Sequence, residues 1–213
     1  ANLAAEPRVT GAVYVTGNSG IDALLHARGS AAGPRLDAKR KTILVTCHRR
    51  ENRAGALARI CMALKSLVAE MPVEIVFALH PNRHIRAAIE TMLANIPHIS
   101  LIEPLPYPEM VGLMDASWLI LTDSGGLQEE GPALGRPVLV MREVTERTEA
   151  PANVALVGTE PRAILAAVHR LLMDEVRYAR MSSPALPFGD GHAAPRIAIL
   201  IEDFIAGRTR LAL

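Results

Sequence analysis

Short runs of apolar and β-branched residues alternate along the chain with longer stretches in which apolar residues recur at helical spacing. The first pattern is typical of buried strands, and the second is typical of helices with one face on a core. The predicted strands are residues 12–16, 42–46, 73–79, 99–102, 118–121, 137–141 and 154–157. The predicted helices are residues 21–28, 57–68, 85–93, a short one ending at 114, 127–134, 164–173, 176–181 and 197–205. This order predicts an α/β fold with a doubly wound, mostly parallel sheet, as in Rossmann-like domains.

Length and composition fit one such domain. The chain has 213 residues, of which 50% are hydrophobic and 21% charged, enough to bury a core. No internal repeat or low-complexity tract divides the sequence. We therefore expect a single domain over residues 1–213, in which residues 189–213 form a carboxyl-terminal tail helix.

The charge balance and the apolar runs indicate where the protein works. Lys and Arg number 23 against 22 Asp and Glu, and aromatic residues make up 3%, so we expect neither a nucleic-acid nor a membrane partner. No stretch approaches the roughly 20 apolar residues that cross a bilayer, and the first residues show no signal-peptide pattern. A soluble, cytoplasmic protein is the expectation.

Cysteine and histidine spacing gives no sign of a metal site or disulfide scaffold. Cys47 and Cys61 are the two cysteines, and they have no C-x-x-C spacing. No two histidines form a spaced metal pair with a carboxylate, so we expect no metal, and no cofactor is called for. Cys47 and His48 do not form a catalytic dyad, because neighbouring residues of an extended strand point to opposite faces.

The candidate chemistry lies in loops that follow predicted strands. In a doubly wound sheet, ligands bind beyond the carboxyl ends of the strands. The loops at that edge are residues 48–52, 80–82, 103–107, 122–126 and 142–149, and they hold the unusual polar segments of the chain. We therefore expect these segments to meet at one site.

The strongest local pattern is WLILTDSGGLQEE, in which a strand runs into Ser124, Gly125 and Gly126 and then into a helix. Glycines allow close backbone approach, and the start of a helix favours a phosphate. Glu130, about one turn into the helix, can accept hydrogen bonds from a ribose diol. The alternative is a plain helix capped by Ser124 after a Gly-Gly turn.

Three further loops carry weaker patterns. Arg147 in TERTEA is either a phosphate or ribose ligand or part of a solvated charge run. His48 in HRREN, at the end of a strand, is placed to act as an acid, a base or a phosphate donor, with Arg49 adding anion affinity. His80 in LHPN is either near His48 or a structural histidine in a capped turn.

Together these segments resemble the non-hydrolysing UDP-N-acetylglucosamine 2-epimerase family. They follow one another in order over nearly the whole chain, and the TDSGG-x-QEE and HRREN blocks are specific in combination. The segments are VTGNSGIDALL (Val15–Leu25), ILVTCHRREN (Ile43–Asn52), LHPN (Leu79–Asn82), LIEPLPYPEM (Leu101–Met110), LILTDSGGLQEEGPALGRPVLVMREVTERTEA (Leu119–Ala150), LVGT (Leu156–Thr159) and FGDGHAAPRI (Phe188–Ile197).

The resemblance implies a Rossmann-like domain of a GT-B-like, two-domain architecture, in which this chain is the carboxyl-terminal, UDP-binding half. By resemblance, Ser124, Gly125 and Gly126 bind the diphosphate. Glu130 binds the ribose, and Arg147 binds the nucleotide or a phosphate.

Other roles also follow from the resemblance. His48 corresponds to the active-site histidine beside the diphosphate, and Leu105 and Met110 stand where the family holds the uracil. Arg49 and His80 match positions that contact a second, regulatory UDP-sugar in some bacterial members.

The implied activity is that of an isomerase of polysaccharide biosynthesis, which interconverts UDP-GlcNAc and UDP-ManNAc by eliminating and re-adding UDP. The partners implied are UDP or UDP-GlcNAc, the amino-terminal domain that carries the essential carboxylates, and, as in intact members, a second copy in a homodimer. Without the amino-terminal domain, we expect this chain to be inactive. The loop after TERTEA is also about two residues shorter than in the family, and Thr148 replaces a usual proline.

Three alternatives stay open at this point. The chain could be a non-catalytic UDP-sugar-binding module, a hydrolysing epimerase, or a relative of the GT-B glycosyltransferases.

Overall fold

The computed structural model describes residues 6–9, 12–28, 39–47, 55–146 and 151–208. The chain divides into two compact units. The sheet unit is Ala27–Pro187, and the tail unit combines Ala1–His26 with Phe188–Leu213. The single domain expected over residues 1–213 stays a prediction.

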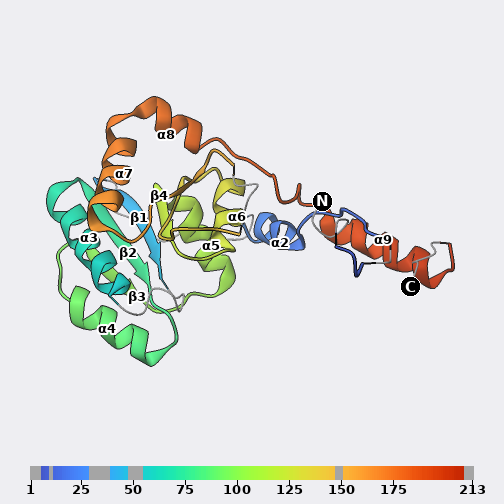
Figure 1. The fold of residues 1–213 in the computed structure, drawn as a ribbon, viewed down its shortest axis with the longest axis horizontal. Helices are drawn as coiled ribbons and strands as arrows, with labels where there is room; N and C mark the ends of the chain where they lie inside the picture. The colour runs from blue at the N-terminus through green and yellow to red at the C-terminus, as the bar shows by residue number, and fades with distance from the viewer. Residues whose placement is uncertain (1–5, 10–11, 29–38, 48–54, 147–150, 209–213) are drawn as a thin grey trace. The chain divides into compact units, whose positions relative to one another are not determined.

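The sheet unit is built on a parallel sheet, as the alternation of strands and helices predicted (Figure 1). Within the described residues the sheet has six strands in the order β3-β2-β1-β4-β5-β6. They are β1 (Lys41–Thr46), β2 (Val73–Ala78), β3 (Ile99–Ile102), β4 (Leu119–Thr122), β5 (Val138–Val140) and β6 (Val154–Leu156). Ile43 of β1 pairs with Ile75 on one side and with Leu119 on the other. The doubly wound, Rossmann-like fold is confirmed.

Helices follow the strands as expected. They are α2 (Ser19–Arg28), α3 (Ala56–Glu70), α4 (Arg83–Leu93), α5 (Tyr107–Ala116), α6 (Leu127–Ala133), α7 (Pro161–Met173), α8 (Glu175–Met181) and α9 (Ala193–Ile205). None of the helices in the described part of the chain is long and apolar enough to cross a membrane.

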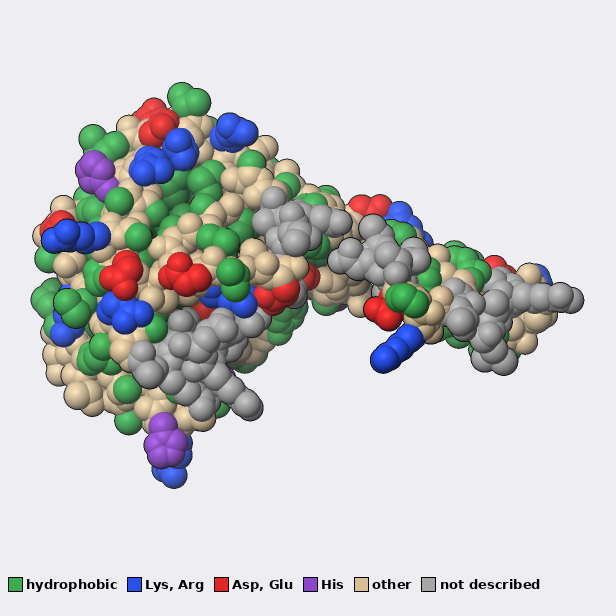
Figure 2. Space-filling model, in the orientation of Figure 1, with side chains coloured by type: hydrophobic (Ala, Val, Ile, Leu, Met, Phe, Trp, Pro, Cys, Tyr) green, Lys and Arg blue, Asp and Glu red, His purple; other side chains and the backbone are tan. Residues whose placement is uncertain are grey.

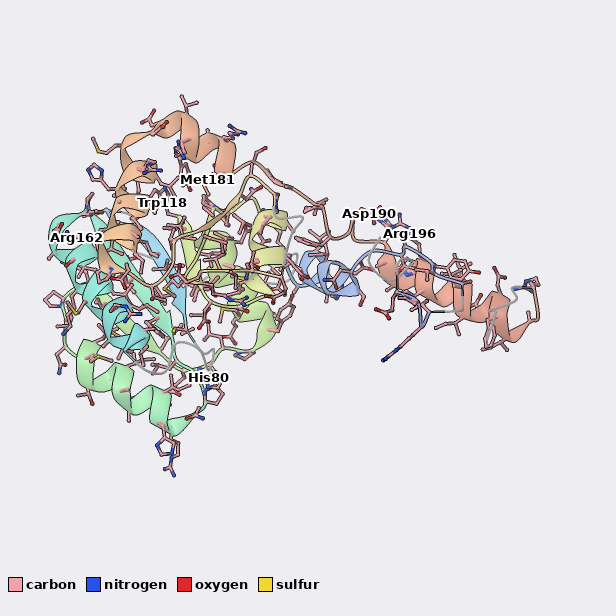
Figure 3. All side chains as sticks on the ribbon, viewed as in Figure 1. His80, Trp118, Arg162, Met181, Asp190 and Arg196 are labelled. Atoms are coloured by element: carbon pink, nitrogen blue, oxygen red, sulfur yellow. The ribbon has the colours of Figure 1, made fainter. Side chains whose placement is uncertain are left out.

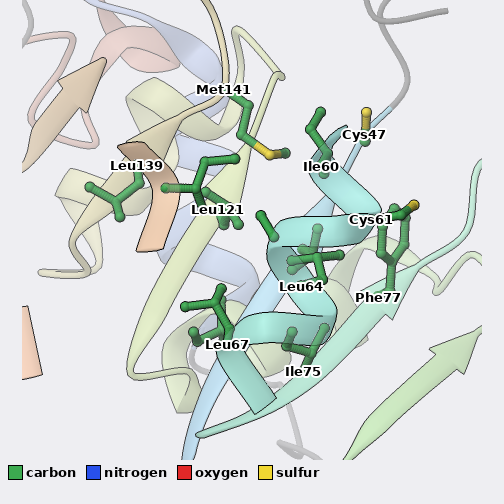
Figure 4. Close-up of a cluster of buried hydrophobic side chains, with 14 of the residues drawn as sticks. Cys47, Ile60, Cys61, Leu64, Leu67, Ile75, Phe77, Leu121, Leu139 and Met141 are labelled. Atoms are coloured by element: carbon green, nitrogen blue, oxygen red, sulfur yellow. The ribbon is translucent and has the colours of Figure 1, made fainter. Parts of the chain in front are cut away.

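The main core lies between one face of the sheet and helices α3, α4 and α7, with α3 at its centre (Figure 4). Leu64 and Leu67 of α3 pack in one cluster with Ile75 and Phe77 of β2, and all four are fully buried. Cys61 of α3 belongs to this cluster, and burial raises the pKa of its thiol to about 11. The thiol is therefore protonated near neutral pH and behaves as a small apolar side chain.

Helix α6 packs against the opposite face of the sheet at Gly131. A Cβ atom built on Gly131 would overlap Cγ2 of Val138 in β5 and would lie 3.3 Å from Cδ1 of Ile120 in β4. Only glycine therefore lets the helix approach this closely. The approach matters for function, because α6 begins directly after the Ser-Gly-Gly turn.

The tail unit joins the two ends of the chain through backbone and charged contacts. The Asn18 amide donates to the Phe188 carbonyl at 2.8 Å. Arg196 of α9 donates two hydrogen bonds of 2.7 Å to Asp190, and this pairing holds the pKa of Asp190 well below its usual range (Figure 3). Two segments of the family resemblance, distant in sequence, are thus adjacent in space.

Two sequence predictions need correction in the tail unit. The described residues 12–18 contain no strand, and Val15 is 94% exposed. A β-branched pattern makes a strand only where a neighbouring strand can pair with it. Helix α9 begins at Ala193 rather than Ile197, because Asp22 accepts hydrogen bonds from the amides of Ala193 (3.1 Å) and Ala194 (2.6 Å) and thereby caps the helix.

Helix α9 carries apolar side chains that the described part of the tail unit leaves exposed, and some hydrophobic atoms are visible at the surface there (Figure 2). Ile201 is 52% exposed and Phe204 47% exposed. The apolar stripe consists of Ile197, Ile201, Phe204 and Ile205, at the spacing of one helix face. Such a stripe ordinarily packs against another surface.

Replacing Gly131 with Ala tests the close approach of α6 to the sheet. A Gly-to-Ala change inside a helix ordinarily stabilises it, by about 0.5–1 kcal/mol. Here the added methyl group would overlap Val138, so we expect the free energy of unfolding to fall by about 1–3 kcal/mol in urea denaturation. Adding Val138→Ala makes room for the methyl group, so the double variant should lose less than the sum of the single changes. Gly131→Ala stability equal to or above that of the unsubstituted chain would contradict this packing.

Candidate functional site

A cavity of about 280 Å³ lies at the carboxyl ends of the central strands. The chain crosses from β1 to β2 on one side and reaches β4 on the other, so the strand order reverses between β1 and β4. Reversal points of this kind are where open α/β sheets bind ligands. The lining residues are Thr46, Cys47, Ala78, Leu79, His80, Pro81, Pro104, Leu105, Tyr107, Met110, Ser124, Gly126, Leu127 and Glu130.

The cavity brings together most of the predicted site residues that the structure describes. Those lining it are His80, Leu105, Met110, Ser124, Gly126 and Glu130. Gly125 stands in the same turn, between two lining residues. The other predicted residues, His48, Arg49 and Arg147, lie outside the described residues.

The Ser-Gly-Gly turn does not follow the simple helix-cap alternative. The N-cap of α6 is Gly126, and no side-chain cap hydrogen bond is found there among the described residues. A Cβ atom on Gly126 would meet only the Ser124 hydroxyl, at 3.9 Å, so the backbone borders open space. A ligand can therefore approach the main chain at this turn.

A buried polar network supports the turn from below. The Ser124 amide donates to the Thr122 hydroxyl at 2.9 Å, and the hydroxyls of Thr122 and Thr46 lie 2.6 Å apart. Both threonines are buried, at the ends of β4 and β1. The turn is thus fixed to the two strands on either side of the reversal point.

Gln128 is a supporting residue that sequence reasoning missed. It is fully buried, its side-chain amide donates to the Ser124 carbonyl at 3.1 Å, and its oxygen accepts from the Thr145 hydroxyl at 2.7 Å. It therefore links the turn to the loop after β5. The available signal was a neutral amide beside the two glutamates of LQEE.

Tyr107 is a second residue that sequence reasoning missed. Its hydroxyl donates to Oε1 of Glu130 at 2.9 Å, and both side chains line the cavity. Burial, followed by the charge of Glu130, raises the pKa of Tyr107, so the tyrosine stays protonated as a donor. Burial also raises the pKa of Glu130, and the Tyr107 hydrogen bond opposes that shift.

His80 has the geometry of a structural histidine in a capped turn, while its predicted proximity to His48 falls outside the described residues. Its Nδ1 accepts from the Asn82 amide at 3.0 Å, and the Asn82 side chain caps α4 by accepting from the His84 amide at 3.0 Å. This is the geometry of a capped turn. His80 nevertheless lines the cavity, so its place in the capped turn does not prevent it from contacting a ligand.

The described residues contain no group of three His, Cys, Asp or Glu side chains that could hold a metal ion. The chemistry of the cavity is instead that of a binding site with an apolar side, a carboxylate and an open glycine turn. The apolar side is formed by Leu105, Met110 and Leu127. A ligand with a flat apolar part, hydroxyl groups and an anionic part would match it.

Comparison with known proteins shows the family to which the chain is similar. The family model described as UDP-N-acetylglucosamine 2-epimerase matches residues 1–202. The UDP-N-acetylglucosamine 2-epimerase of Salmonella typhimurium is 43% identical over 207 residues, which cover 90% of this chain and 55% of that protein. The chain spans about half the length of the curated relatives it matches.

Solved structures show the same fold. The UDP-GlcNAc 2-epimerase of Neisseria meningitidis, solved with UDP-GlcNAc bound, is 36% identical with a TM-score of 0.82, over 90% of this chain and 55% of that one. The S. aureus protein MnaA, solved with UDP, is 34% identical with a TM-score of 0.86, over 95% of this chain and 57% of that one.

Proposed function

The chain belongs to the UDP-N-acetylglucosamine 2-epimerase family, and we propose that its cavity binds the uridine diphosphate part of a UDP-sugar. One observation carries the proposal. Residues from two separate segments, the one that leads from β3 into α5 and the one that leads from β4 into α6, are together expected to bind all three parts of UDP, and they line a single cavity at the reversal point of the sheet. The relatives solved with UDP or UDP-GlcNAc support the choice of ligand.

Each part of the nucleotide has a matching surface. Leu105 and Met110 offer apolar contact for the uracil ring. The Glu130 carboxylate accepts hydrogen bonds from the ribose hydroxyls. The turn Ser124–Gly126 offers a hydroxyl and unobstructed backbone to the diphosphate. Arg147, which lies outside the described residues, binds the nucleotide or a phosphate in this proposal.

The reaction we propose for the complete protein is the interconversion of UDP-GlcNAc and UDP-ManNAc. A base removes the C2 proton while the bond from C1 to the diphosphate oxygen breaks, which releases UDP and leaves a glycal. UDP then adds back at C1, and C2 gains a proton on the opposite face. Hydrogen-bond donors beside the diphosphate, including His48, stabilise the negative charge of the departing UDP. His80 and Arg49 keep their proposed contact with a regulatory UDP-sugar.

The groups that transfer the C2 proton come, in this proposal, from the part of the relatives that this chain does not span. The relatives are nearly twice as long as the matched region. The apolar stripe of α9, exposed within the tail unit, supports a further domain of the same protein as its partner. The homodimer, the cytoplasmic location and the absence of nucleic-acid and membrane partners stay predictions.

Titration of UDP into the chain by calorimetry tests the binding site. We expect saturable binding that Glu130→Ala weakens at least tenfold, because a hydrogen bond to a charged group contributes about 1.5–3 kcal/mol. Glu129→Ala is the matched control, since Glu129 precedes Glu130 on α6 and does not line the cavity. Equal affinity of the two variants would rule out the ribose contact.

A proton-exchange experiment tests whether the groups that transfer the C2 proton lie outside this chain. UDP-GlcNAc is incubated in D₂O with the chain alone, then with the remaining half of a family member added, and the C2 proton is followed by NMR. We expect no exchange with the chain alone and exchange once both halves are present. Exchange catalysed by this chain alone would show that it already carries the base, contrary to the proposal. UDP binding without exchange in either mixture would favour the non-catalytic binding module.

A further inference from the structure

We propose that Tyr107 is a positioning residue that fixes the Glu130 carboxylate, and thereby sets how strongly the cavity prefers a ribonucleotide to a 2′-deoxyribonucleotide. The inference rests on the proposed function of the cavity. It adds a residue and a selectivity that the sequence patterns did not indicate. The observation behind it is the 2.9 Å hydrogen bond from the Tyr107 hydroxyl to Oε1 of Glu130.

The hydrogen bond joins two elements that the chain builds separately. Tyr107 is the first residue of α5, and Glu130 lies on α6, 23 positions later. A free glutamate loses rotamer entropy when a ligand fixes it, at a cost of up to about 2 kcal/mol. Because Tyr107 already fixes Glu130 before the ligand arrives, less of that cost falls on binding.

Tyr107 is itself held by a stiff segment. Pro106 is the N-cap of α5, with φ −52° and ψ 147°, and Pro108 follows inside the first turn. Proline restricts φ on both sides of the tyrosine. At the other end of the segment, Glu103 accepts two hydrogen bonds from Arg86 of α4, one of them 2.7 Å long. The backbone around Tyr107 is therefore already restricted, and it loses little conformational entropy when a ligand binds.

The surroundings of Glu130 disfavour its ionised form, and the Tyr107 hydrogen bond opposes this effect. Burial is the main cause that raises the pKa of Glu130, the charge of Glu129 adds to it, and Tyr107 lowers it. Cys47 and His80 are the other titratable groups of the described lining. A protonated Glu130 would be a weaker acceptor for ribose hydroxyls. Tyr107 thus keeps the carboxylate ionised to lower pH as well as oriented.

A merely structural hydrogen bond between α5 and α6 makes a different prediction. Its loss would change the free energy of unfolding and would weaken the binding of UDP and of 2′-deoxy-UDP to the same extent. A positioning role acts through the contact between Glu130 and the ribose diol, so its loss changes the ratio of the two affinities. Both nucleotides carry the same diphosphate, so any effect of its protonation on affinity is the same for both and does not change the ratio.

The test measures the dissociation constants of UDP and 2′-deoxy-UDP with the unsubstituted chain, Tyr107→Phe and Tyr178→Phe. We expect the unsubstituted chain to prefer UDP, and Tyr107→Phe to reduce that preference by about three- to tenfold, which is less than the full value of the hydrogen bonds between Glu130 and the ribose because the carboxylate itself remains. Tyr178→Phe is the matched control, because Tyr178 donates to the Trp118 carbonyl at 2.9 Å and does not line the cavity. An unchanged ratio in Tyr107→Phe would overturn the proposal.

A second readout needs no nucleotide. The side-chain carboxyl carbon of Glu130 is followed by NMR against pH in the unliganded chain and in Tyr107→Phe. We expect the apparent pKa of Glu130 to rise when the hydroxyl is removed, because the hydrogen bond stabilises the charged form. An unchanged pKa would show that the tyrosine does not act on Glu130. Absence of UDP binding by the unsubstituted chain would instead refute the proposed function, and this titration would still decide the role of Tyr107.

Discussion

Strand β1 is the constraint on which the rest of the structure depends. It is hydrogen-bonded to β2 on one side and to β4 on the other, in matched register, and its central residues Ile43, Leu44 and Val45 are fully buried. Because all the strands are parallel, their carboxyl ends meet at one edge. The loops that leave β1, β2, β3 and β4 therefore line one cavity, although they are far apart in the sequence.

The turn at this edge is held in place before any ligand binds. The hydroxyls of Thr46 in β1 and Thr122 in β4 are hydrogen-bonded to each other, and the Thr122 hydroxyl also accepts from the Ser124 amide. The Gln128 side chain donates to the Ser124 carbonyl and accepts from the Thr145 hydroxyl. A buried network with its partners satisfied specifies one arrangement. The same burial makes the Glu130 carboxylate harder to ionise, and the Tyr107 hydroxyl partly offsets that effect. The polar side chains around the cavity therefore both hold the turn in one conformation and influence the ionisation of Glu130.

Much of the fold and part of the site could be predicted from the sequence, for reasons that individual elements make plain. The buried strand β1 (Lys41–Thr46) has a continuous apolar run and helix α3 has apolar residues at helical spacing, so both could be predicted. Residues 12–16 have the same local character and form no strand, because strand formation needs a partner that the local pattern does not record. Helix α9 starts early because of a cap from Asp22, 171 residues before Ala193.

In the site too, local sequence patterns could be predicted and contacts between distant residues could not. Glycines and a glutamate after a strand marked the turn and Glu130, whereas Tyr107 and Gln128 act through contacts that only the folded chain creates. Gln128 makes its contacts with residues on two different loops, and Tyr107 reaches another helix. Such cross-element contacts leave no periodic trace in a single sequence.

The central claim is that UDP occupies the cavity where the strand order reverses. A crystal structure of this chain with UDP tests it most directly. We expect the ribose hydroxyls within hydrogen-bonding distance of Glu130, the uracil against Leu105 and Met110, and the diphosphate beside the turn at Ser124. UDP bound elsewhere, with this cavity empty, would contradict it.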